Sequence, residues 1–143
     1  MSQLFLIAHL AGRAVAIESG QVESVVDIGA IIPVPRADRQ IRGLAALRSR
    51  VMTVIDSRAA LGLPPAIIAA TRAVITLVEG HHYAILVDSL EDVAPFELLP
   101  LSGGIVLDRG WQATGCGIVE RDGEPILAID LRALVPGLTA IAA

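Results

Sequence analysis

The sequence predicts an all-β protein made of two small, curled antiparallel barrels that pack against one another. The apolar segments are short and are separated by turn residues, which is typical of strands. A weak internal duplication covers most of the chain, which indicates that one β unit occurs twice. Of the 143 residues, 54% are hydrophobic but only four are aromatic, so the core must consist mainly of Val, Ile, Leu and Ala.

The first half of the chain contains five expected strands, at 3–10, 14–18, 28–34, 44–47 and 51–55. The first two and the last two are expected to form hairpins. The segment 20–26 carries valines at helical spacing and predicts about one helical turn. Pro33 and Pro35 predict that the third strand lies at a sheet edge or leads out of the sheet, because proline cannot donate to a ladder. Asp56 or Ser57 can cap a short helix at 58–61.

The second half contains five more expected strands, at 73–79, 83–87, 90–93, 115–120 and 126–129. A turn is expected at 80–82 and an irregular loop at 102–108. The last two strands flank an Asp-Gly dipeptide, which is a strong hairpin signal. Asp130 then caps a last short helix at 131–134.

The duplication appears at two offsets. At 68 residues, the matched pairs are Gly12 with Gly80, Ala16 with Ala84, Ile17 with Ile85, Glu23 with Glu91, and Val25 with Val93. At 74 residues, the motif Ile-Asp-x-Arg-Ala at 55–59 recurs at 129–133. A six-residue insertion in the glycine-rich loop at 102–110 accounts for the change. Units of roughly 65 residues bury little core alone, so we expect one domain, 1–143, with subdomains near 12–70 and 71–136. Strand 3–10 precedes both ranges and is a candidate to cross to the other barrel.

The composition excludes several classes of function. The longest uncharged stretch, 59–71, has 13 residues and is interrupted by glycine and proline, so no membrane insertion is expected. No signal peptide is evident, and the single cysteine fits a reducing, cytoplasmic compartment. The net charge is −4, all eleven basic residues are arginine and aromatic residues are scarce, so nucleic-acid binding is disfavoured.

Residues suited to catalysis are few. His81 and His82 adjoin at the predicted 80–82 turn, without further ligands at metal-binding spacing, so no metal or cofactor is expected. Cys116 lies between two glycines and is expected to be a small buried thiol. The chain is therefore expected not to be an enzyme. The alternative is a small thiol-dependent enzyme or ligand-binding barrel that uses Cys116, His81 and the glycine-rich loop.

The segment 41–64, with Gly43, Leu47-Arg48 and Val54-Ile55-Asp56-Ser57-Arg58, resembles the signature of the CheW family of coupling adaptors in bacterial chemotaxis. Leu86-Val87-Asp88-Ser89-Leu90 and the closing segment 126–134 extend this resemblance over about residues 3–136. It implies two five-stranded SH3-like barrels with short capping helices. Three departures, Ala46, Ser49 and Ser24, replace the usual Asn, Gly and Glu of the family, which suggests another turn type or a specialised paralogue.

The resemblance also implies partners. They are the cytoplasmic helical tip of a methyl-accepting chemoreceptor, seated in an apolar groove between the barrels, and the regulatory domain of a CheA-type histidine kinase. The protein would be recruited through them to membrane receptor arrays. The candidate residues for binding receptor or kinase are Arg48, Gly43, Leu47, Val51, Val25, Ile85 and Val87. The alternatives are an ordinary hairpin arginine for Arg48, a role in backbone geometry for Gly43 and simple barrel core for the five apolar residues. A further alternative is a structural β module that self-associates through edges at Pro33 and Pro95.

Overall fold

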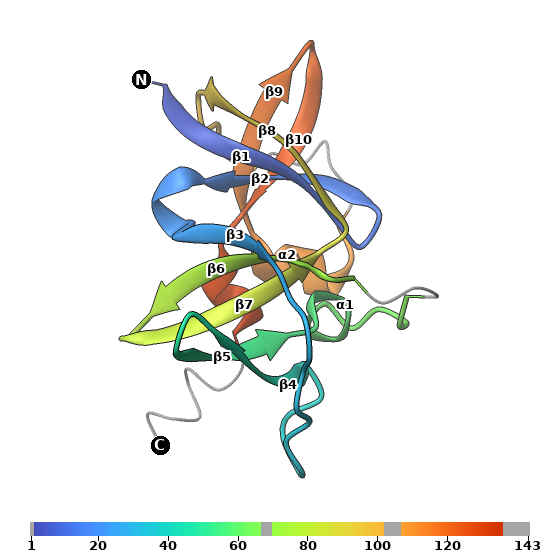
Figure 1. The fold of residues 1–143 in the computed structure, drawn as a ribbon. Helices are drawn as coiled ribbons and strands as arrows, with labels where there is room; N and C mark the ends of the chain where they lie inside the picture. Colours follow the sequence, from blue (N-terminus) through green and yellow to red (C-terminus); the bar gives the residue numbers. More distant parts are fainter. Residues whose placement is uncertain (1, 67–69, 102–106, 136–143) are drawn as a thin grey trace.

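Ten strands form two five-stranded sheets in the computed structural model, which describes residues 2–66, 70–101 and 107–135 (Figure 1). Sheet A contains, in spatial order, β8 (Ser89–Phe96), β1 (Gln3–Leu10), β2 (Arg13–Glu18), β10 (Glu124–Ile129) and β9 (Gly115–Arg121). Sheet B contains β3 (Ser24–Asp27), β6 (Arg72–Val78), β7 (His81–Val87), β5 (Arg50–Ile55) and β4 (Ile41–Leu47). The all-β prediction is confirmed.

The two sheets have the same strand order once each strand is matched to its counterpart in the duplication. β8 in sheet A takes the place of β3 in sheet B, and β1, β2, β10 and β9 take the places of β6, β7, β5 and β4. In both sheets one internal pair is parallel, β2 with β10 and β5 with β7, and the other pairs are antiparallel.

An isolated bridge joins the two edges of each sheet and closes it into a barrel. In sheet B, the backbones of Ile32 and Leu44 exchange two hydrogen bonds of 2.8 Å each. In sheet A, Leu99 and Ile118 exchange equivalent bonds of 2.8 and 2.9 Å. Both bridges connect the segment after one edge strand with the opposite edge strand. The closure leaves only part of each edge unpaired.

The sheets do not follow the expected division into 12–70 and 71–136. Sheet A takes β1 and β2 from the first half of the chain and β8 to β10 from the second, whereas sheet B takes β3 to β5 from the first half and β6 and β7 from the second. The physical reason is the parallel pairing, because each parallel pair joins one strand from each half. The strand at 3–10 accordingly lies beside β8, from the second half.

Three groups of buried side chains form the core. One lies inside barrel A, the barrel that sheet A forms, and includes Phe5 and Ile7. Another lies inside barrel B, formed by sheet B, and includes Met52 and Val54. The third and largest lies between the barrels. Alternate residues of β1 serve two of these groups, since Leu6 belongs to the shared core and Phe5 to barrel A. Burial on both faces explains why this strand is a continuous apolar run.

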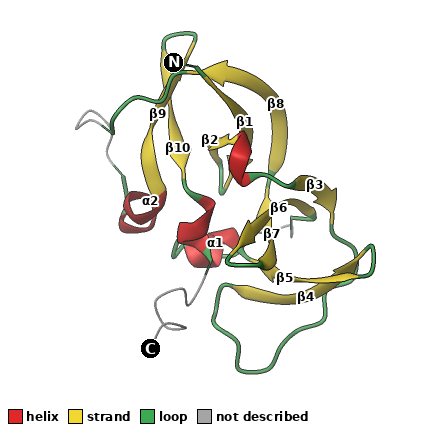
Figure 2. Cartoon of the chain, turned by 90° about the vertical axis from the view of Figure 1, so that its left-hand side faces the viewer, coloured by secondary structure: helices red, strands yellow, loops and turns green. Residues whose placement is uncertain are grey.

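Short helices lie near the boundary between the two sheets (Figure 2). Asp56 caps α1 (Ser57–Ala60) by accepting from the backbone N–H of Arg58 at 3.1 Å, and Asp130 caps η2 (Leu131–Leu134) by accepting from that of Arg132 at 3.0 Å. Both predicted caps are confirmed. The helix α2 (Arg109–Thr114) was not predicted. It is only six residues long, contains Gly110 and follows a glycine-rich segment, a pattern that favours a loop. Residues 102–106 of the expected loop, and the residues beyond 135, lie outside the described part.

Two sequence predictions in the first half are wrong. The expected turn at 20–26 is limited to a short 3-10 turn, η1 (Ser19–Gln21), and Val25 and Val26 belong to β3, which pairs with β6. The expected strand at 28–34 contributes only the bridge at Ile32, because prolines interrupt its ladder. In the second half, the turn before β7 consists of Glu79 and Gly80, so both histidines lie in the strand instead of the turn.

Gly43 is the backbone position on which closure of barrel B depends. It lies at a register shift in β4 with φ +150°, and an added Cβ would lie 2.3 Å from the carbonyl oxygen of Ile32. We predict that Gly43→Ala lowers the free energy of unfolding by about 2 kcal/mol, because the bridge to Ile32 must shift. Urea unfolding measures this change.

The matched control is Gly29→Ala, where an added Cβ meets nothing within 4 Å. We expect that variant to stay within about 0.5 kcal/mol of the unmodified protein. Equal stability of the Gly43 and Gly29 variants would show that the close approach does not constrain β4.

Candidate protein-binding site

A pocket of about 350 Å³ opens where the two edges of barrel B separate. We call it the β3 pocket. Its lining comes from β3 and the residue before it, from the tip of the β4–β5 hairpin and from β6: Glu23, Ser24, Val25, Val26, Leu47, Arg48, Arg50, Met52 and Ile75. Three of the residues predicted from sequence, Val25, Leu47 and Arg48, therefore lie together.

The floor of the β3 pocket is apolar and its rim is charged. Met52 and Ile75 are buried members of the barrel B core, and Leu47 packs against the same group. Val25 is 37% exposed, although it is a branched apolar side chain in an edge strand. An exposed apolar surface beside charged groups is a common feature of protein-binding sites.

Arg48 is presented by the turn of the β4–β5 hairpin. Arg48 and Ser49 have φ values of +51° and +66°, the signature of a type I′ turn. This turn normally favours Asn-Gly, so two residues with a Cβ occupy a conformation that disfavours them. The Arg48 side chain is exposed, and its guanidinium makes no ion pair within the described ranges. It is therefore available to a carboxylate from outside.

The other predicted residues do not line this pocket. Ile85 and Val87 are 0% and 1% exposed in the core between the barrels, so the prediction that they line a groove is wrong. From Ala84 to Val87 both faces of β7 are buried, and an apolar strand does not show which face contacts solvent. Val51 is 59% exposed but faces away from its neighbour Met52, on the outer face of β5. Gly43 is buried and acts through backbone geometry.

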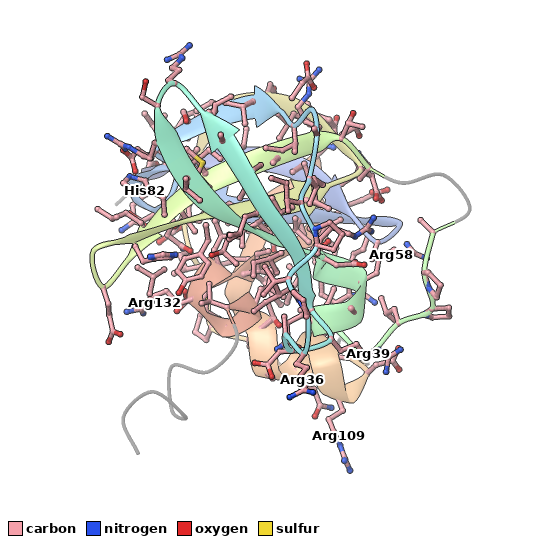
Figure 3. The ribbon with its side chains drawn as sticks, turned by 60° about the horizontal axis from the view of Figure 1, so that its bottom comes forward. Arg36, Arg39, Arg58, His82, Arg109 and Arg132 are labelled. Carbon is pink, nitrogen blue, oxygen red and sulfur yellow. The ribbon has the colours of Figure 1, made fainter. Side chains whose placement is uncertain are left out.

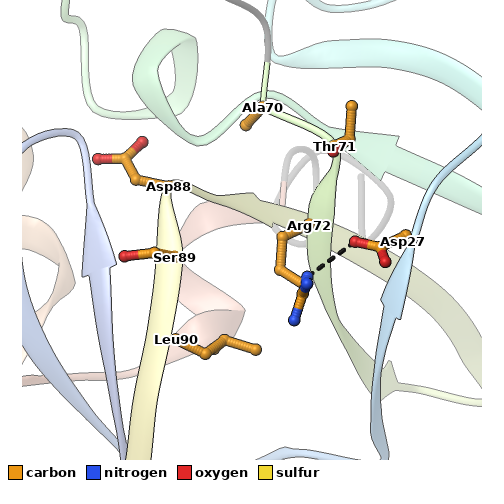
Figure 4. Close-up of a pocket in the computed structure, with 7 residues that line it drawn as sticks. All are labelled: Asp27, Ala70, Thr71, Arg72, Asp88, Ser89 and Leu90. Atoms are coloured by element: carbon orange, nitrogen blue, oxygen red, sulfur yellow. Dashed lines mark hydrogen bonds and ion pairs between the residues drawn. The ribbon is translucent and has the colours of Figure 1, made fainter.

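The hollow between the two sheets differs from the apolar groove that the sequence suggested. It has a volume of about 570 Å³ and lies where β7 of sheet B leads into β8 of sheet A (Figure 4). In one wall Asp27 accepts a hydrogen bond from Arg72 of the neighbouring strand at 2.7 Å, and Asp88 is a third charged group in the lining. Charged groups this close to the surface favour a polar occupant or water.

The family model of the CheW-like domain matches residues 4–138. The chain belongs to the CheW family. Among solved structures it is similar to the scaffolding protein TtCheW from Thermoanaerobacter tengcongensis, with a TM-score of 0.80, 24% sequence identity and coverage of 96% of each chain. This similarity shows the fold, two SH3-like barrels. None of the curated proteins matches the chain.

The two barrels of this CheW-like domain differ at the seam, which is the place where the two edges of one barrel meet. In barrel A, Arg121 of β9 lies 3.2 Å from Glu91 and 3.9 Å from Asp92 of β8, and His9 lies 2.8 Å from Glu91. The two ion pairs of Arg121 link the edge strands β8 and β9. At the corresponding positions barrel B has Leu47, Glu23 and Ser24. Leu47 cannot pair with Glu23 as Arg121 pairs with Glu91, and Glu23 instead lies 3.6 Å from Arg50 and 2.9 Å from His82. The β3 pocket lies at the seam where Leu47 replaces the arginine and Glu23 pairs with Arg50 and His82.

A polar cluster beside the β3 pocket was missed from sequence. His82 lies 2.7 Å from Arg50 and 2.9 Å from Glu23, which joins β7, β5 and the segment before β3. The sequence pattern placed His82 in a turn, so its neighbours could not be inferred. Only the parallel pairing of β5 with β7 brings Arg50 close to it.

Cys116 of the CheW-like domain does not have the surroundings of a nucleophile. The residue is exposed in β9, contrary to the expectation of a buried thiol. Partial burial of the sulfur raises the pKa of the thiol, and the nearby Asp130 carboxylate raises it further. A catalytic thiol needs the opposite shift. Within residues 2–66, 70–101 and 107–135, no group of three or more His, Cys, Asp or Glu side chains could hold a metal ion.

The described helices are all short, and none of them has the length and apolar character that crossing a membrane requires.

We predict that Cys116 reacts slowly with iodoacetamide. Because its pKa is raised, the thiolate fraction at pH 7.5 is below that of an ordinary cysteine. The alkylation rate of the folded protein should be at least about threefold lower than that of the same protein unfolded in urea. A faster reaction in the folded state would support the alternative function, a thiol-dependent enzyme that uses Cys116.

The Glu91 ion pairs predict a dependence of stability on pH. Hydrogen bonds from Arg121 and then from His9 lower the pKa of Glu91 below its ordinary value of 4.5. This contribution to stability is present above the ordinary pKa and is lost as the pH falls through the lowered value. Glu91→Gln should therefore reduce the unfolding free energy at pH 7 and reduce it less at pH 3, measured by urea unfolding.

Glu97→Gln is the matched control, because Glu97 is exposed and makes no ion pair in the described part of the chain. The same loss for both variants, or a loss for Glu91→Gln that does not change with pH, would contradict the role of this carboxylate at the seam.

Proposed function

We propose that this protein is a non-catalytic coupling adaptor that links the helical tip of a chemoreceptor to the regulatory domain of a CheA-type histidine kinase. Membership of the CheW family supports the class of function. The observation that carries the proposal is the β3 pocket, which combines an apolar floor with an exposed arginine. Localisation in the cytoplasm, with recruitment to receptor arrays through the partners, follows from this role.

The β3 pocket suits one face of an amphipathic helix. An apolar side chain of the helix can cover Met52 and displace water from the floor. A carboxylate one turn away can then accept hydrogen bonds from the guanidinium of Arg48, which can donate two in parallel. Ser24 lies in the wall where the family usually has Glu, so the pocket lacks one negative charge. We propose that the receptor tip supplies a matching acidic residue.

An adaptor between two proteins needs a second surface. On sheet A, Leu4 of β1 and Val93 of β8 are both more than half exposed and lie on adjacent strands. Their apolar surface is separate from the β3 pocket, which lies on sheet B. We propose that the kinase regulatory domain contacts this edge of sheet A. Coupling then requires only that the rigid double barrel hold both partners in one geometry.

We predict that Arg48→Glu and Val25→Asp each weaken binding of a chemoreceptor tip fragment by at least tenfold. The first replaces an attractive charge with a repulsive one, and the second places a carboxylate on the apolar wall. Isothermal titration calorimetry with a helical-hairpin fragment of a receptor tip measures the change. The unmodified protein should bind with a Kd in the micromolar range.

Arg109→Glu is the control, since it makes the same change of charge on an exposed arginine far from His82, which contacts the pocket residues Arg50 and Glu23 (Figure 3). We expect that variant to change the Kd less than twofold. Equal effects of Arg48→Glu and Arg109→Glu would show that binding depends on the overall charge of the protein and not on the β3 pocket. Failure of the folded protein to bind receptor and kinase fragments would overturn the proposed function.

A further inference from the structure

The cluster of His82, Arg50 and Glu23 joins three elements at the edge of the β3 pocket. His82 Nε2 lies 2.7 Å from Arg50 Nη1 and 2.9 Å from Glu23 Oε2. Arg50 and Glu23 also lie 3.6 Å apart and both line the pocket. The His82 side chain is only 18% exposed, so it is the most enclosed member of the cluster.

The two short contacts of His82 need different protonation states. A guanidinium only donates hydrogen bonds, so Arg50 requires a lone pair on Nε2. A carboxylate only accepts them, so Glu23 requires a proton on the same nitrogen. One nitrogen atom cannot satisfy both partners at once. The 2.7 Å contact therefore belongs to neutral His82, and the 2.9 Å contact belongs to His82 with Nε2 protonated.

Few other groups face this imidazole. From β6, Leu77 lies opposite His82 in the antiparallel ladder and carries no charge. Within β7, His81 and Tyr83 point to the other face, where His81 Nε2 lies 3.1 Å from Thr53 Oγ1. The charged groups that face His82 from the elements packed against it are thus Arg50 from β5 and Glu23 from the segment before β3.

We propose that His82 is a proton-operated switch that sets the charge presented at the β3 pocket. When His82 is neutral, its Nε2 accepts from Arg50 and holds that guanidinium at the side of the pocket. When His82 gains a proton, it donates to Glu23 and repels Arg50, which turns toward the pocket and its occupant. The switch itself is a property of the free protein, whereas its effect on receptor binding rests on the proposed function.

Histidine as a residue type changes charge near neutral pH, so ¹⁵N NMR of the imidazole between pH 5 and 9 tests the switch in the free protein. Neutral His82 should be the Nδ1–H tautomer, with Nε2 as the unprotonated nitrogen. The guanidinium resonances of Arg50 and the carboxyl resonance of Glu23 should shift with the same midpoint as His82. An Nε2–H tautomer in the neutral form, or a titration that leaves Arg50 unchanged, would overturn the proposal.

Binding of a receptor tip fragment without histidine gives the second measurement. We expect a Kd about two- to fivefold lower at pH 6 than at pH 8, because one more cation then faces the acidic partner. His82→Gln should remove this dependence, since an amide can accept from Arg50 and donate to Glu23 together. His81→Gln, on the opposite face, should retain it. The same pH dependence in His82→Gln would exclude His82 as its source.

The two measurements separate the two proposals. If the fragment binds at neither pH, the proposed function fails. The NMR experiment then still decides whether protonation of His82 changes the contacts of Arg50. If the fragment binds and the tautomer is wrong, the adaptor function stands and the switch fails.

Discussion

The fold depends on the parallel pairing of β2 with β10 and of β5 with β7. Each pair places a strand from one half of the chain beside a strand from the other, so both sheets need both halves. The largest group of buried side chains lies between the sheets and draws on both. Because units of about 65 residues are marginal on their own, we expect this shared core to make the chain unfold as one cooperative domain.

Local chemistry predicted much of this architecture. Helix caps at Asp56 and Asp130 and the Asp-Gly hairpin turn follow from side-chain and backbone preferences that act over a few residues. The exchange of strands between halves could not be predicted, since periodicity shows that a strand is buried but not which strand it pairs with. For the same reason Ile85 and Val87 were assigned to a groove although they belong to the shared core.

The candidate site arises from a difference between two copies of one unit. Barrel A holds its edge strands together through Arg121 and Glu91, whereas Leu47 occupies the position of Arg121 in barrel B. In barrel B the counterpart of Glu91, Glu23, pairs with Arg50 and His82 instead, and the β3 pocket opens beside these contacts. The sequence predicted three residues of this site from a resemblance, but the His82 cluster beside it depends on contacts between strands that are distant in the chain.

The central claim is that a partner helix docks at the seam of barrel B. Amide chemical-shift mapping of the ¹⁵N-labelled protein during titration with a chemoreceptor tip fragment tests it most directly. The largest changes should fall on residues 23–26 and on Leu47, Arg48, Arg50 and Met52, which line the β3 pocket. Changes centred instead on the charged hollow at Asp27, Arg72 and Asp88, or on the ion-paired seam of barrel A, would contradict this account.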